Sequence, residues 1–170
     1  MQGASLLNPT DRLTRDAALL GVTLSEADAR RLLLLLDELA HWNRSFNLTA
    51  ITEREAMVTH HLLDSLSING DLEGQEIADV GTGAGFPGLP LAVANPQRRF
   101  TLIARALAPL PRLLELVEPM CAPGTRVLAM KGRRPDEELA ALPEPWKLLG
   151  ARELTVPGLA AARCVLVLGR

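Results

Sequence analysis

The chain has 170 residues, a hydrophobic share of 48%, a net charge of −2 and two cysteines. This length predicts one domain with room for a small helical appendage, and the composition allows a sizeable buried core. Cys121 and Cys164 lack the spacing of zinc ligands, the longest leucine run is too short to cross a bilayer, and the start lacks a signal-peptide pattern. We therefore expect a cytoplasmic protein without a metal site or a membrane span.

Apolar residues recur at helical spacing over residues 10–20 and 32–40, which predicts two helices, and Ser25 with Asp28 resembles a capping box ahead of the second. A third helix is predicted after Thr52, which together with Glu55 resembles a capping box. We therefore assign residues 1–70 to an N-terminal helical part.

The pattern changes at Glu76, where short apolar runs begin to alternate with helical segments. Strands are predicted at 77–80, 100–103, 126–130, 148–156 and 164–168, and helices at 87–95, 107–117 and 135–142. Strands that alternate with helices indicate an α/β fold with a parallel-rich sheet. We assign this sheet to residues 71–170.

The basic residues are concentrated in one segment. Residues 1–80 have 13 acidic and 6 basic side chains, whereas residues 97–134 have 8 basic and 2 acidic ones. Such a segment can contact phosphate groups although the whole chain is acidic, and a solvated face is the alternative. With only five aromatic residues in the chain, a stacking platform for single-stranded RNA is poorly supported.

The densest motif is a glycine loop between the first predicted strand and the next helix, with the pattern D-x-G-x-G-x-G from Asp79 to Gly85. Glycines allow the backbone to approach a ligand closely, and a helix N-terminus attracts an anionic group. A tight turn without ligand is one alternative. A dinucleotide is another, because Gly83, Gly85 and Gly88 fit G-x-G-x-x-G. The position of Asp79 favours S-adenosylmethionine (SAM), because this form resembles the first motif of SAM methyltransferases.

Several separated motifs together resemble one family. They are WNRSFNLT at 42–49, HHLLDSL at 60–66, the glycine loop, and MKG at 130–132. In combination they resemble the RsmG (GidB) family of 16S rRNA guanine-N7 methyltransferases. The resemblance runs through most of the chain and implies a Rossmann-like SAM-binding sheet behind an N-terminal helical part.

The resemblance also implies roles for individual residues. SAM binding is implied for Asp79, Gly81, Gly83, Gly85, Phe86 and Arg105. Substrate positioning is implied for Lys131 and Arg105, without a catalytic nucleophile. His61, Asp64 and Ser65 are implied to shape the pocket beside the loop, although His61 and Asp64 could equally form a local pair on one helix. Lys131 could equally be a plain surface lysine.

One segment departs from the family pattern. In the family, the strand after the first crossover ends with an acidic residue that binds the SAM ribose, and further strands and helices follow. Here residues 101–103 lead directly to Ala104 and Arg105, so that at least one strand-crossover unit of roughly 30 residues is missing after Ile103. We interpret residues 100–105 as a hybrid strand. We expect it on the side of the first strand where the fourth strand of the family lies, because the downstream elements could then pack unchanged.

The resulting expectation is a monomeric enzyme that uses SAM to methylate guanine N7 in 16S rRNA or the small ribosomal subunit. The alternative is a non-catalytic family member that binds rRNA or the ribosome without turnover, because the shortened domain lacks part of the cofactor wall. A nicotinamide-linked oxidoreductase ranks last, because Ala104 stands where that cofactor needs an acid.

Overall fold

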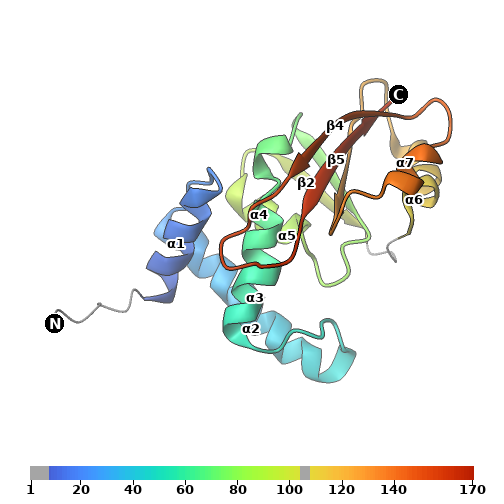
Figure 1. Cartoon of the computed structure of the whole chain (residues 1–170). Helices are drawn as coiled ribbons and strands as arrows, with labels where there is room; N and C mark the ends of the chain where they lie inside the picture. Colours follow the sequence, from blue (N-terminus) through green and yellow to red (C-terminus); the bar gives the residue numbers. More distant parts are fainter. Residues whose placement is uncertain (1–7, 104–107) are drawn as a thin grey trace.

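The computed structural model describes residues 8–103 and 108–170, and its N-terminal part is helical (Figure 1). Helix α1 (Pro9–Leu19) follows Asn8, whose side chain accepts a hydrogen bond from the Asp11 N–H. Helix α2 (Glu26–Phe46) is capped in the same way by Ser25. A side-chain oxygen at this position replaces a hydrogen bond that the first helical turn cannot form internally. The two helices predicted from the apolar spacing are thus confirmed.

The third helical segment is continuous but irregular. It consists of α3 (Arg54–Met57), a π-helical turn η1 (Val58–Leu63) and α4 (Asp64–Leu66), and a 3-10 turn η2 (Asn69–Asp71) follows. The predicted cap at Thr52 is wrong. Glu53 is the cap residue, and its carboxylate accepts hydrogen bonds from the N–H groups of Glu55 and Ala56.

The strands form two separate sheets. Strand β1 (Glu76–Val80) is followed by α5 (Gly88–Ala94) and then by β2 (Arg99–Ile103), which pairs in parallel with β1. The second sheet has the order β3-β5-β4 and is antiparallel throughout. Its elements are β3 (Val127–Lys131), β4 (Lys147–Glu153) and β5 (Cys164–Gly169), together with α6 (Leu110–Val117), η3 (Glu118–Met120) and α7 (Asp136–Ala140).

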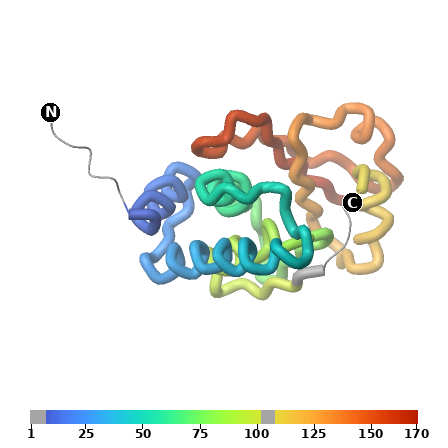
Figure 2. The backbone as a smooth tube through the Cα atoms, turned by 90° about the horizontal axis from the view of Figure 1, so that it is seen from below, coloured from blue at the N-terminus to red at the C-terminus, as the bar shows by residue number. Residues whose placement is uncertain are grey.

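The fold is an α/β sheet fold with N-terminal helices, as predicted, and its β1-α5-β2 unit is Rossmann-like. Parallel pairing in the described part of the chain is limited to β1 and β2, however, so the fold is less parallel than expected. Figure 2 shows α1 at one end of the molecule, α2 running from there through the middle, and α6 with α7 at the other end.

The hybrid strand does not complete the sheet in the expected way. A strand in the position of the family's fourth strand would pair with β1 on one side and with β3 on the other. Within the described residues, β2 pairs only with β1, and no hydrogen-bonded ladder joins it to β3. The expected ladder from this strand to the downstream strands is therefore not found in the described residues, while the side of β1 on which the strand lies stays a prediction. Contact between the two sheets is made by side chains instead, because Phe100 and Ile77 pack into the same apolar cluster as Leu128.

The core of the helical part extends to the glycine loop. Leu32, Leu36 and Leu62 are fully buried in it, and burial of each leucine contributes about 1.5–3 kcal/mol. Phe86 of the glycine loop and Val156 from the segment after β4 pack into the same cluster. The N-terminal helices thus hold the glycine loop from one side. In residues 8–103 and 108–170, no helix is both long and apolar enough to cross a membrane.

Candidate functional site

The glycine loop connects β1 to α5 and has a backbone that requires glycine. Gly81, Gly83 and Gly85 have φ angles of 89°, 54° and 95°, a region that side chains with a Cβ rarely adopt. The Gly85 position is also enclosed, because a Cβ there would collide with the side chain of Leu89. Gly83 is exposed, and a Cβ built there meets no atom within 4 Å. The loop therefore presents its backbone to open space on the side of Gly83.

Asp79 closes this loop from the end of β1. Its Oδ2 accepts a hydrogen bond of 2.7 Å from the N–H of Gly88, the first residue of α5. Burial raises the pKa of Asp79, and the hydrogen bond from Gly88 opposes that rise. The carboxylate thus fixes the end of the strand against the start of the helix.

His61 contacts the loop from the helical part. Its ring stacks on Phe86, with the ring centroids 4.9 Å apart and the planes 28° apart. Its Nε2 lies 3.0 Å from the Thr49 Oγ1, which also accepts a hydrogen bond from the Ile51 N–H. Burial, and next the nearby His60, lower the pKa of His61, while Asp64 opposes this. The π-helical turn that contains His61 is thereby connected to the glycine loop and to the segment after α2.

That segment is held by a pair of hydrogen bonds at the end of α2. The Asn43 side chain accepts a hydrogen bond of 2.8 Å from the Thr49 N–H and donates one of 3.0 Å to the Thr49 carbonyl. Asn47 ends α2 in the left-handed conformation, with a φ of 49°. The motif at 42–49 therefore forms a tight bend that places Thr49 beside His61.

Asp64 and Ser65 follow the π-helical turn of His61, and each makes a polar contact that holds this turn. Asp64 accepts from the Arg163 Nε at 3.0 and 3.1 Å, an ion pair between the end of the η1 turn and the segment before β5. Ser65 is buried and donates its hydroxyl hydrogen to the carbonyl of His61. Both residues thus stabilise the turn that carries His61.

Lys131 lies at the end of β3 and is paired with Glu138. Its Nζ is 2.9 Å from Oε2 and 3.2 Å from Oε1 of Glu138, and both side chains are largely shielded from solvent. The same Oε2 accepts a hydrogen bond of 2.6 Å from the N–H of Leu110, at the start of α6. The bond from Leu110, and next Lys131, lower the pKa of Glu138 against the opposing effect of burial.

The structure brings most of the predicted site residues into one neighbourhood. Asp79, the three glycines, Phe86 and His61 are joined by direct contacts or by the loop itself. Lys131 belongs to a separate cluster with Glu138. Arg105, predicted both to bind SAM and to position RNA, lies outside the described residues. Sequence reasoning missed Thr49, Arg163 and Glu138 as partners, and the only signal for them was Thr49 within the motif at 42–49.

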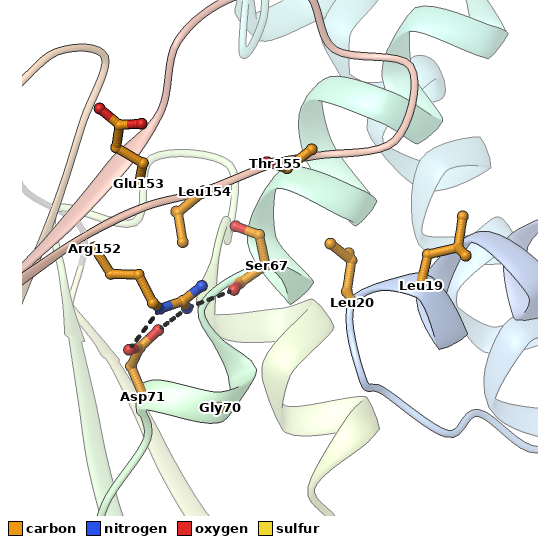
Figure 3. A pocket seen from close by; sticks show the side chains of 9 residues that line it. All are labelled: Leu19, Leu20, Ser67, Gly70, Asp71, Arg152, Glu153, Leu154 and Thr155. Carbon is orange, nitrogen blue, oxygen red and sulfur yellow. Dashed lines mark hydrogen bonds and ion pairs between the residues drawn. The ribbon is translucent and has the colours of Figure 1, made fainter.

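A cavity of about 410 Å³ lies elsewhere, between the end of α1, η2 and the end of β4 (Figure 3). Its most prominent feature is Arg152, whose Nη2 donates hydrogen bonds to Asp71 at 2.5 Å and to the Ser67 carbonyl at 3.2 Å. No residue of the glycine loop lines it. The cavity is therefore distinct from the candidate site.

The strand, glycine loop and helix, joined to a helical N-terminal part, define a Rossmann-like fold of the SAM-methyltransferase type. Comparison with known proteins narrows this class to a family. The family model for rRNA small subunit methyltransferase G (GidB) matches residues 28–104 and 101–167. The chain belongs to this methyltransferase family.

Similar proteins named ribosomal RNA small subunit methyltransferase G occur in several bacteria. The protein from Nitrosospira multiformis is 35% identical over 213 residues, which covers 96% of this chain and 99% of the relative. The protein from Nitrosococcus oceani is 37% identical, with 89% and 90% covered. The protein from Ralstonia nicotianae is 34% identical, with 99% and 98% covered.

These matches locate the shortening of the domain. The two segments of the family match overlap at residues 101–104, so this stretch resembles the family in two places. The alignment with the Nitrosospira protein is 43 positions longer than the 170-residue chain. Both findings agree with a hybrid strand that joins two distant parts of the family domain.

Proposed function

We propose that this chain transfers a methyl group from SAM to N7 of a guanine in 16S rRNA. The family and its relatives support methyl transfer to small-subunit rRNA. The observation that carries the cofactor assignment is the glycine loop between β1 and α5, which Asp79 fixes and His61 supports through Phe86. The nitrogen position and the 16S target rest on the family resemblance.

The residues of the loop fit the amino-acid end of SAM. The backbone at Gly83 borders open space, and it directly follows the buried Thr82. Asp79, Gly81, Gly83, Gly85 and Phe86 are the residues that we propose to hold this end. The ribose end fits less well, because the residues that follow Leu102 are Ile, Ala, Arg and Ala, with no acid. Loss of a charged hydrogen-bond acceptor weakens binding by about 1.5–3 kcal/mol, or roughly 10- to 100-fold.

The proposed chemistry asks little of the protein beyond orientation. SAM, when bound, supplies an electrophilic methyl group on a sulfonium centre. Guanine N7 has a free lone pair, so the chain needs no general base to remove a proton before attack. The protein therefore contributes proximity and alignment. A base inside a duplex is hard to align in this way, so the target guanine must be unpaired or displaced.

Two basic residues are proposed to position the RNA. Arg105 borders the cofactor site by resemblance, and Lys131 ends the strand β3. Lys131 is already paired with Glu138, so an RNA phosphate must compete with that carboxylate. His61, Asp64 and Ser65 are proposed to shape the pocket by holding the helical turn against Phe86. We also propose residues 1–70 and 71–170 as the two parts of the chain.

A second candidate function is RNA or ribosome binding without turnover. The split between the β1-β2 sheet and the β3-β5-β4 sheet favours it, together with the absence of an acid after β2. A chain that binds rRNA but takes up no SAM would have this function.

The proposed function is tested by methyl transfer from radiolabelled SAM to unmodified 16S rRNA and to small subunits that lack the modification. Borohydride reduction followed by aniline cleavage then locates N7-methylguanine in the RNA. Incorporation at one cleavable guanine is the expected result. Incorporation at a position resistant to cleavage would contradict the N7 assignment, and no incorporation with either substrate would contradict the enzyme.

A further inference from the structure

The connection between β4 and β5 packs against the helical N-terminal part. It runs from Leu154 to Arg163, and the Leu154 N–H donates a hydrogen bond of 2.8 Å to the Arg163 carbonyl. Val156 is buried in the apolar cluster against which Phe86 of the glycine loop also packs. Figure 1 shows the connection passing beside α3 and α4. The C-terminal sheet therefore reaches the helical part through this connection.

The connection contacts the helical turn of His61 at two points. At Gly158, which has a φ of 79°, an added Cβ would lie 3.3 Å from the Thr59 Oγ1, so the chain passes close to this side chain. At Arg163, the Nε lies 3.0 and 3.1 Å from the two carboxylate oxygens of Asp64. The side chains of Arg163 and Asp64 are only 23% and 16% exposed, so solvent and salt screen this ion pair weakly.

The π-helical turn passes this support on to the glycine loop. Asp64 lies three residues after His61 on the same helical segment. The ring of His61 stacks on Phe86, which belongs to the loop. Arg163 is thus connected to the loop through direct contacts between neighbouring side chains, which is how energetic coupling between separate sites is carried.

The divided sheet makes these side-chain contacts important. In a continuous sheet, backbone hydrogen bonds would fix the C-terminal strands against β1, which leads into the glycine loop. In residues 8–103 and 108–170, no ladder joins the β1-β2 sheet to the β3-β5-β4 sheet. Three ion pairs of the described residues link the two parts instead, namely Arg126 with Glu73, Arg152 with Asp71, and Arg163 with Asp64. The last pair is the most shielded of the three, and it is the one beside the turn of His61.

We propose that Arg163 is a positioning residue for the glycine loop. Its ion pair with Asp64 fixes the π-helical turn against the C-terminal sheet, and this turn holds the loop in its binding conformation through His61 and Phe86. In the described part of the chain, the Arg163 side chain forms hydrogen bonds with Asp64 and with the preceding carbonyl but with no residue of the loop. It therefore acts through Asp64. The inference rests on the proposed function for the identity of the ligand, SAM.

The first test measures amide hydrogen exchange in the chain without SAM. The N–H groups of Gly85 and Phe86 donate to the Thr82 carbonyl at 2.9 and 3.1 Å, so their exchange reports local opening of the loop. Arg163→Met keeps an unbranched apolar side chain but removes the ion pair. It should speed the exchange of both groups about 2- to 30-fold, the range in which a residue acts through packed neighbours.

Arg152→Met is the matched control. Arg152 pairs with Asp71 of the 3-10 turn η2, away from the turn of His61 (Figure 3). Its loss breaks an ion pair between the same two parts of the chain, so the control reproduces a general loss of stability. Exchange of the two loop amides should stay unchanged in Arg152→Met. Equal acceleration in both methionine variants would overturn the proposal, as would unchanged exchange in Arg163→Met.

Two further variants test the route through Asp64. Arg163→Lys keeps the charge and one nitrogen that can donate to the carboxylate, so it should recover much of the exchange protection that Arg163→Met loses. Asp64→Asn breaks the same ion pair from the other side and should speed the exchange in the same way. It also decides the question if Arg163→Met does not fold. Combining Asp64→Asn with Arg163→Met should add little, whereas additive effects would show that Arg163 does not act through Asp64.

Calorimetric titration with SAM then measures the consequence for the ligand. Arg163→Met should bind SAM at least about 2-fold more weakly, Arg163→Lys should recover this loss, and Arg152→Met should match the unchanged chain. Faster exchange with unchanged SAM affinity would show that Arg163 has only a structural role, and the proposal would be wrong. If the unchanged chain takes up no SAM but Arg163→Met still speeds exchange of the loop, the proposed function fails and the support of the loop by Arg163 stands.

Discussion

His61 and Phe86 stack with their ring centroids 4.9 Å apart, which joins the π-helical turn of the N-terminal part to the glycine loop. The two residues are 25 positions apart in the sequence. The contact explains why the helices and the glycine loop share one apolar core. It also means that the protonation of His61 affects how the loop is held.

Stability should therefore depend on pH through His61. The pKa of His61 is lowered from its ordinary value of 6.5, chiefly by burial. Between that lowered pKa and 6.5, the unfolded chain binds more protons at this residue than the folded chain. The contribution of the buried, neutral His61 to the free energy of unfolding is therefore lost as the pH falls through this range. We expect His61→Gln to lose less stability than the unchanged chain between about pH 8 and 5, as measured by urea unfolding. His41→Gln, at an exposed position, should keep the dependence of the unchanged chain. Equal slopes for His61→Gln and the unchanged chain would contradict the assignment.

The glycines of the loop should differ in their tolerance of substitution. Gly83→Ala places a Cβ in open space and should cost about 1–2 kcal/mol, the typical penalty of left-handed backbone. Gly85→Ala adds a collision with Leu89 at a φ of 95°, so its cost should exceed that of Gly83→Ala. A double-mutant cycle with Leu89→Ala should show a favourable coupling of at least about 0.5 kcal/mol. Equal costs for both glycines would show that the loop has a different conformation.

Asp79 should stabilise the loop through its acceptor oxygen. Asp79→Ala leaves the buried Gly88 N–H without its acceptor, which should cost about 1–3 kcal/mol in the free energy of unfolding. Asp79→Asn retains an oxygen that can accept this hydrogen bond and should cost less. Chemical unfolding of both variants measures the difference. If the two variants are equally stable, the hydrogen bond to Gly88 does not fix the loop.

Lys131 and Glu138 should affect RNA binding in opposite directions. Lys131→Ala should weaken binding of 16S rRNA. It should also reduce by about 1 the slope of the logarithm of the RNA affinity against the logarithm of the salt concentration. Glu138→Gln removes the competing charge and should strengthen RNA binding, although it weakens the hydrogen bond from the Leu110 N–H to this side chain. RNA affinities over a series of salt concentrations test both variants. Weaker binding by Glu138→Gln with unchanged stability would show that Lys131 needs its partner and does not contact phosphate.

Local patterns in the sequence predicted the elements well. Polar caps, apolar periodicity and the glycine pattern act within a few residues, so α1, α2, β1 and the glycine loop lie where they were predicted. The cap of α3 was missed by one residue, because Glu53 can also accept hydrogen bonds from the first turn.

The arrangement of the strands could not be predicted in the same way. Whether β2 pairs with β3 depends on segments far apart in the chain and on how the shortened domain closes. The same holds for the site. The pair of Asp64 with Arg163 joins residues 99 positions apart, and no local pattern indicates it.

The most direct test of the account is calorimetric titration of the folded chain with SAM, with circular dichroism as the check of folding. We predict micromolar binding that Gly83→Ala weakens while Leu34→Ala leaves it unchanged, because the backbone at Gly83 faces the open side of the loop. A folded chain that shows no heat of binding would contradict the assignment of the glycine loop to SAM and would favour the non-catalytic RNA-binding function.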